Sequence, residues 1–148
     1  MSRGLDMSAQ ASTHPRWQRI AQSVVAVVAG LIAIIVLSLA SDQVFHTLGV
    51  YPPWGEPMHE PGLNLLALSY RILFGVMGGF VAALLAPHHP MRHALALGVV
   101  GLVLSTAGAA GAIAAEMGPA WFPVALVLIA VPCAWVGGLL HRQWRGQS

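Results

Sequence analysis

Arg71 is the clearest candidate for a chemical role in this sequence, because it is the one charged residue in an apolar run at residues 63–86. Placing an ionised group in lipid costs at least about 2.5 to 3.5 kcal/mol, so such a charge needs a partner or a function. A planar guanidinium pairs well with a carboxylate through two parallel hydrogen bonds. We therefore favour a structural ion pair that closes one end of a helix bundle. The candidate partners are Asp42, Glu56, Glu60 and Glu116.

Two other interpretations of Arg71 stay open. About 20 residues cross a bilayer, which places Arg71 close to one boundary of its apolar run, so its long side chain can snorkel to the headgroups without a partner. Alternatively, the guanidinium belongs to a site for an anion or another substrate.

Three histidines, His88, His89 and His93, lie beside Arg92 in a short turn. Imidazoles at this density can bind a transition metal or respond to pH near neutrality. We favour a simpler interpretation, in which the turn contacts lipid headgroups. A second polar segment, residues 42–62, contains carboxylates and imidazoles without the spacing that selects one metal. We expect this segment to cap the bundle.

Several classes of function lack their signatures. The sequence has no phosphate-binding glycine loop, no zinc-binding His-Glu-x-x-His helix and no Gly-x-Ser-x-Gly elbow. Its single cysteine, Cys133, excludes an intrachain disulfide and a thiolate-rich metal site. A net charge of +2 is too small to indicate a nucleic-acid partner. The sequence therefore predicts no enzyme and no cofactor.

The elements that position these residues are four apolar segments, at residues 20–41, 63–86, 94–115 and 119–140. Each is long enough to cross a hydrocarbon core of about 30 Å as a helix. Only 8% of the residues are charged, against roughly 25% in soluble domains, and the mean hydropathy is +0.72. The composition predicts an all-α, polytopic membrane protein with four transmembrane helices within residues 20–141, flanked by tails at residues 1–19 and 142–148.

The arginines predict the orientation, because Lys and Arg near helix ends are retained in the cytoplasm. The two tails and the turn after residue 86 contain Arg3, Arg16, Arg19, Arg92, Arg142 and Arg145. The opposite connections contain no arginine and hold four of the five acidic residues. Both termini are therefore expected in the cytoplasm. One alternative stays open, in which the first apolar segment is a signal peptide cleaved after Ser38-Leu39-Ala40.

Small residues indicate how the helices pack, because association in lipid depends on close backbone approach and interhelical hydrogen bonds. In segment 94–115, Gly98, Gly101 and Ser105 share one helical face, and in segment 63–86 Gly75 and Gly78 share a face with Arg71. We expect the last three segments to form the tightly packed unit. The first segment is richer in Val, Ile and Leu and is expected to face lipid.

Three motifs carry a resemblance to known sequences. They are Leu68-Ser69-Tyr70-Arg71, Gly75-Val76-Met77-Gly78-Gly79 and Ala86-Pro87-His88-His89-Pro90-Met91-Arg92-His93-Ala94-Leu95. Over roughly the last three segments the chain resembles a family of small, uncharacterised four-helix bacterial inner-membrane proteins, which implies the fold and the inner membrane but no activity. It lacks the glutamate in the first helix of small multidrug exporters and the glycine-arginine pattern of fluoride channels.

These observations predict a structural or accessory component of the bacterial inner membrane. The expected partners are the lipid bilayer and either a larger membrane complex or further copies of the chain. The alternative is a small oligomeric transporter or channel subunit, since four short helices enclose little pathway on their own. A third possibility is a metal- or pH-responsive sensor that uses His88, His89 and His93.

Overall fold

The computed structural model describes residues 15–147, and within them the chain forms α-helices and no strand. The helices are α1 (Arg16–Thr47), α2 (Pro61–Leu85), α3 (Pro90–Ala114) and α4 (Trp121–Gly146). All four are long and apolar enough to cross a membrane. The predicted all-α architecture with four spans is thereby confirmed, and it indicates a multi-pass membrane protein. Arg3 lies outside the described residues.

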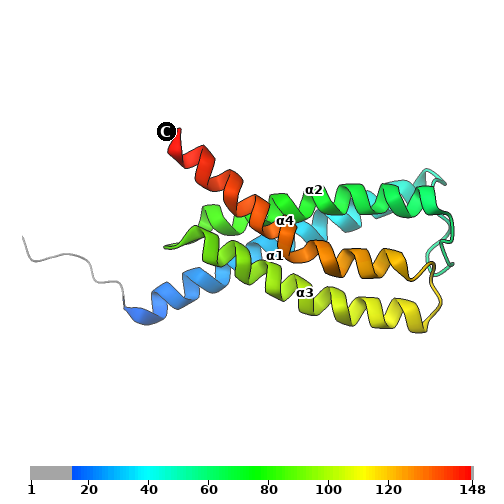
Figure 1. The fold of residues 1–148 in the computed structure, drawn as a ribbon, viewed down its shortest axis with the longest axis horizontal. Coiled ribbons are helices and arrows are strands. Elements are labelled where there is room, and N and C mark those ends of the chain that lie inside the picture. The colour runs from blue at the N-terminus through cyan, green and yellow to red at the C-terminus, as the bar shows by residue number, and fades with distance from the viewer. Residues whose placement is uncertain (1–14, 148) are drawn as a thin grey trace, which may run out of the picture.

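The connections place the charged residues at opposite ends of an elongated bundle (Figure 1). One end contains the start of α1, the α2–α3 turn and the end of α4, and we call it the arginine end because all the described arginines except Arg71 lie there. The other end, the loop end, contains the connections at residues 48–60 and 115–120. Both described ends of the chain therefore lie at the same end of the bundle.

Proline determines where two of the helices start. Pro61 and Pro90 occupy the first positions of α2 and α3, where a missing N–H breaks no intrahelical hydrogen bond. His89 precedes α3 in the left-handed conformation, with φ of 46°. Pro132 lies inside α4 without ending it, as neighbouring helices permit in membrane proteins.

Helix α1 continues past the predicted end of its apolar segment and includes Asp42, which we had expected in the following loop. Hydropathy ends a segment at the first charge, but a helix needs only that its backbone hydrogen bonds continue. Asp42 is 7% exposed, so its carboxylate belongs to the helix packing rather than to a solvated loop.

Helix α2 is the central helix, because it packs against α1, α3 and α4. The α3–α4 and α2–α4 interfaces are the most extensive, and α1–α2 comes next, ahead of α2–α3. Within residues 15–147, α1 also packs against α3 but has no close backbone approach to α4. Helix α1 is the least buried of the four helices, as its Val, Ile and Leu content predicts, although one of its faces packs against α2.

A glycine, which has no side chain, allows the close contact between α1 and α2. Gly30 of α1 is buried, and a Cβ there would lie 2.7 Å from the Gly78 carbonyl oxygen of α2. The backbones of the two helices touch, as small residues allow in membranes.

The other packing residues expected from the sequence face α4. A Cβ on Gly75 would lie 3.0 Å from Cys133 Cβ, and one on Gly98 would lie 3.1 Å from Val131 Cα. The fit is looser at Gly101, whose Cβ would be 3.8 Å from Ala130 Cβ, and Ser105 is half-buried. These residues hold α2 and α3 against α4.

Many large apolar side chains are exposed on the outside of the bundle. Val25, Val103 and Leu128 are 61%, 62% and 68% exposed. The residues buried among the helices are mostly small, including Ala26, Ala67, Ala82 and Ala94. This distribution suits a lipid solvent, in which apolar side chains need not be buried to be stable.

Candidate functional site

The candidate site is an ion pair at the loop-end half of the bundle. Arg71 Nη2 of α2 donates to Asp42 Oδ2 of α1 at 2.7 Å. The Tyr70 hydroxyl donates to the other carboxylate oxygen, Oδ1. The side chains of Arg71 and Asp42 are 25% and 11% exposed. The structure thus pairs Arg71 with one of its four candidate partners, and the pair ties α1 to α2.

Aromatic rings enclose this pair. Arg71 Cζ lies 5.4 Å from the centre of the Tyr70 ring and 5.7 Å from that of Phe122, the second residue of α4. Both separations are within the range of cation–π attraction. Phe45 of α1 stacks on Tyr70, with the ring centres 5.8 Å apart. The guanidinium is therefore held by α1, α2 and α4 together.

Tyr51 extends the hydrogen-bonded network into the loop. Its hydroxyl donates to the Tyr70 hydroxyl at 3.3 Å, and Arg71 Nη1 donates to the same oxygen at 3.5 Å. Burial raises the pKa of the Tyr51 hydroxyl above its ordinary value, since a phenolate would lose its hydration there. Tyr51 is thus a neutral donor at physiological pH.

The other candidate carboxylates do not reach the pair. Glu56, Glu60 and Glu116 are exposed, and none of them forms an ion pair with Arg71 in the described chain. Glu60 precedes α2 as its N-cap residue, and Glu116 lies in the α3–α4 connection with φ of 50°. Asp42 differs from these three glutamates because it lies within α1, which packs against α2, and is buried there.

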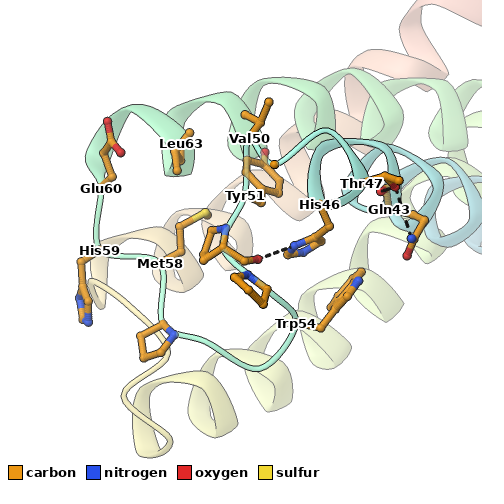
Figure 2. A pocket seen from close by; sticks show the side chains of 14 residues that line it. Gln43, His46, Thr47, Val50, Tyr51, Trp54, Met58, His59, Glu60 and Leu63 are labelled. Atoms are coloured by element: carbon orange, nitrogen blue, oxygen red, sulfur yellow. Dashed lines mark hydrogen bonds between the residues drawn. The ribbon is translucent and has the colours of Figure 1, made fainter.

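The loop at residues 48–60 folds over the end of the bundle and forms a cavity of about 760 Å³ (Figure 2). His46 Nδ1 donates to the Pro52 carbonyl oxygen at 2.6 Å, and its ring lies 4.1 Å from that of Trp54. His59 and Glu60 point away from His46. No three His, Cys, Asp or Glu side chains of the described chain gather as a metal site.

Two further hydrogen bonds attach this loop to the rest of the protein. The Met58 N–H donates to the Met117 carbonyl oxygen at 2.9 Å, and Asn64 Nδ2 donates to the Met58 carbonyl oxygen at 3.0 Å. Asn64 is 2% exposed, so the second bond also satisfies a buried amide. The two connections at the loop end therefore form one cap.

At the arginine end, the rings of His89 and His93 lie 5.5 Å and 5.7 Å from the ring of His88, measured between centres. His93 is buried, and its Nδ1 donates to the His89 carbonyl oxygen at 3.2 Å. This bond fixes the first turn of α3. These three histidines therefore do not gather as a metal site in the described chain.

A second cavity, of about 400 Å³, lies between the helices and is lined by residues of all four. Asp42 and Arg71 are among its lining residues, together with Gly75, Gly98, Gly101 and Ser105. The rest of its lining is mainly apolar and comes largely from side chains of α1 and α4. Gly75, Gly98 and Gly101, which were expected to pack helices together, thus also line this cavity.

Tyr70 is the main site residue that the sequence analysis missed. Its position beside Arg71 was the available signal, because a tyrosine at membrane depth needs a partner for its hydroxyl.

No family model matches the chain, and neither the curated proteins nor the solved structures that were compared contain a match. The resemblance to small bacterial inner-membrane proteins therefore stays a prediction.

Proposed function

We propose that this protein is a structural or accessory component of the bacterial inner membrane and has no enzymatic activity. The observation that carries this proposal is the engagement of Arg71 by Asp42 and Tyr70. A charge at membrane depth is either part of a ligand site or part of the scaffold. Here it is neutralised by a residue of the same chain, which favours the scaffold.

The surroundings of Arg71 support this interpretation. The guanidinium donates to a carboxylate and a phenol and lies against two aromatic rings. An anionic substrate would have to displace Asp42 and leave that carboxylate unpaired at a position only 11% exposed, which costs several kcal/mol. The pair is better suited to hold α1 on α2 than to bind and release a ligand.

The distribution of arginines supports cytoplasmic termini and a multi-pass inner-membrane location. Arg16, Arg19, Arg92, Arg142 and Arg145 all lie at the arginine end, whereas the acidic residues of the described chain lie in the loop-end half. Arginine-rich ends are retained in the cytoplasm. The loop end then faces the periplasm.

The proposal predicts that the protein belongs to a larger assembly. After extraction in a mild detergent, we expect the tagged chain to co-purify with other membrane proteins and to migrate above its own micelle on a native gel.

In a Cys133→Ser background, a Glu56→Cys variant should react with an impermeant maleimide on intact spheroplasts, and a Gly146→Cys variant only after lysis. A chain that purifies alone contradicts the accessory role, and the reverse labelling pattern contradicts the orientation.

The cavity of about 400 Å³ favours one alternative, a small oligomeric transporter or channel subunit. Its volume falls within the range of small-molecule pockets, and it has Arg71 and Asp42 in its lining. The double variant Asp42→Asn, Arg71→Gln separates the two functions, because it removes both charges and keeps hydrogen-bonding groups. A transporter would lose solute flux in proteoliposomes while remaining folded, whereas an accessory protein would keep its partners.

A further inference from the structure

Two adjoining grooves lie between the first half of α1 and the start of α3. One, of about 360 Å³, is lined by Arg16, Arg19 and His88. The other, of about 520 Å³, is lined by apolar residues of both helices and by Arg92. Ser23 and Val24 line both grooves, so the two adjoin along α1.

The two grooves together contain three arginines, Arg16 and Arg19 in the first and Arg92 in the second. Arg16, Arg19 and Arg92 are exposed, and none of them forms an ion pair with an acidic residue of the described chain. All the described carboxylates belong to the other half of the bundle. Within residues 15–147, no nearby carboxylate therefore balances the positive electrostatic potential of the three guanidinium groups.

The helix dipoles add to this potential. Helices α1 and α3 both begin at the arginine end, and neither has a side chain that caps its first N–H groups. The start of a helix carries roughly half a positive charge and binds anions such as phosphate. Two helix starts and three arginines thus converge on the same region.

Apart from Ser23, Arg92 and His93, the second groove is lined by apolar residues, and it extends along α1 as far as Leu31. Val24, Val28 and Leu31 of α1 form one side, and Ala96 and Val100 of α3 form the other. Val24, Val28 and Val100 are 55%, 43% and 37% exposed. In a bilayer this groove opens towards hydrocarbon, so an acyl chain fills it without loss of hydration.

We propose that these two grooves bind one anionic phospholipid. Its phosphate contacts Arg16, Arg19 and Arg92, and one acyl chain lies between α1 and α3 along Val24 and Val28. The three arginines favour an anionic headgroup, and the apolar residues of the second groove favour an acyl chain beside them. Basic pockets between transmembrane helices bind anionic lipids in this way. The lipid fills space between α1 and α3, whose interface is the least extensive among the packed helix pairs.

The test uses the purified full-length chain, with phosphatidylglycerol and phosphatidylcholine of identical acyl chains as probes. Native mass spectrometry should show at least about tenfold tighter binding of one phosphatidylglycerol, because each arginine near an anionic surface contributes to binding. The melting temperature should rise with added phosphatidylglycerol and not with phosphatidylcholine. Equal binding of the two lipids overturns the proposal.

Variants separate the two grooves. The triple variant Arg16→Gln, Arg19→Gln, Arg92→Gln changes only exposed side chains and should lose the preference for phosphatidylglycerol. Arg142→Gln, at the same end on α4, is the matched control and should keep it. Val28→Trp should obstruct the apolar groove and weaken phosphatidylglycerol binding with all arginines present. Retained preference in the triple variant overturns the headgroup site.

A soluble probe distinguishes a lipid from a free anion. Glycerol 3-phosphate presents the same phosphate without acyl chains, and we expect it to leave the melting temperature unchanged at concentrations at which phosphatidylglycerol raises it. If glycerol 3-phosphate binds as tightly as phosphatidylglycerol, the acyl-chain groove is not part of the site and the proposal is wrong.

Discussion

Replacing Asp42 with alanine is expected to destabilise the folded bundle by about 3 kcal/mol, because it leaves the Arg71 guanidinium without its counter-charge at membrane depth. The ion pair is short, at 2.7 Å, and the carboxylate also accepts the Tyr70 hydroxyl. Both bonds are lost together in this variant. The measurement is the free energy of unfolding in mixed micelles with increasing sodium dodecyl sulfate.

The double variant Asp42→Ala, Arg71→Met should recover most of that loss, because it removes the unpaired charge and keeps an apolar chain in its place. Tyr70→Phe should cost less than Asp42→Ala, about 1 to 2 kcal/mol, since it removes hydrogen bonds and leaves the ion pair. The double-mutant cycle isolates the coupling between Asp42 and Arg71.

Glu116→Ala and Glu56→Ala are the matched controls, since both carboxylates are exposed and unpaired with Arg71. Each should change stability by less than about 0.5 kcal/mol. If Asp42→Ala has an effect no larger than these controls, the pair does not stabilise the bundle, and the structural role of Arg71 is wrong.

The spans could be predicted from the sequence, because lipid imposes a length and an apolarity that four segments meet. The partner of Arg71 could not be selected from among four carboxylates. That choice depends on how far α1 continues as a helix beyond its apolar segment, and on the rotation that turns Asp42 towards α2. Neither quantity is encoded in hydropathy.

The small-residue faces were predicted more completely for α2 and α3 than for α1. Gly75 and Gly98 lie at contacts with α4, whereas Gly78 contacts α1, which the sequence analysis left outside the tightly packed unit. Gly30 was missed because Val, Ile and Leu surround it, although Ala26 four residues earlier made a small-xxx-small pair. Such a spacing indicates a helix contact even in a segment whose other residues indicate exposure to lipid.

Substituting alanine for Gly79 or Gly137 is expected to cost about 2 to 3 kcal/mol, because the backbones of α2 and α4 touch at these positions. A Cβ on Gly79 would lie 2.8 Å from Ala134 Cα, and one on Gly137 would lie 2.8 Å from the Gly79 carbonyl carbon. Backbone atoms cannot rotate away as a flexible side chain can. The two helices must separate, and the contacts along their interface are lost with them.

Gly108→Ala and Gly111→Ala make the comparison decisive, because they add the same methyl group where nothing lies within 4 Å. Alanine has the higher helix propensity, so these two variants should be neutral or more stable by up to about 1 kcal/mol. The same detergent titration measures all four. If Gly79→Ala and Gly137→Ala behave like Gly108→Ala, the close approach of α2 and α4 does not exist in the membrane.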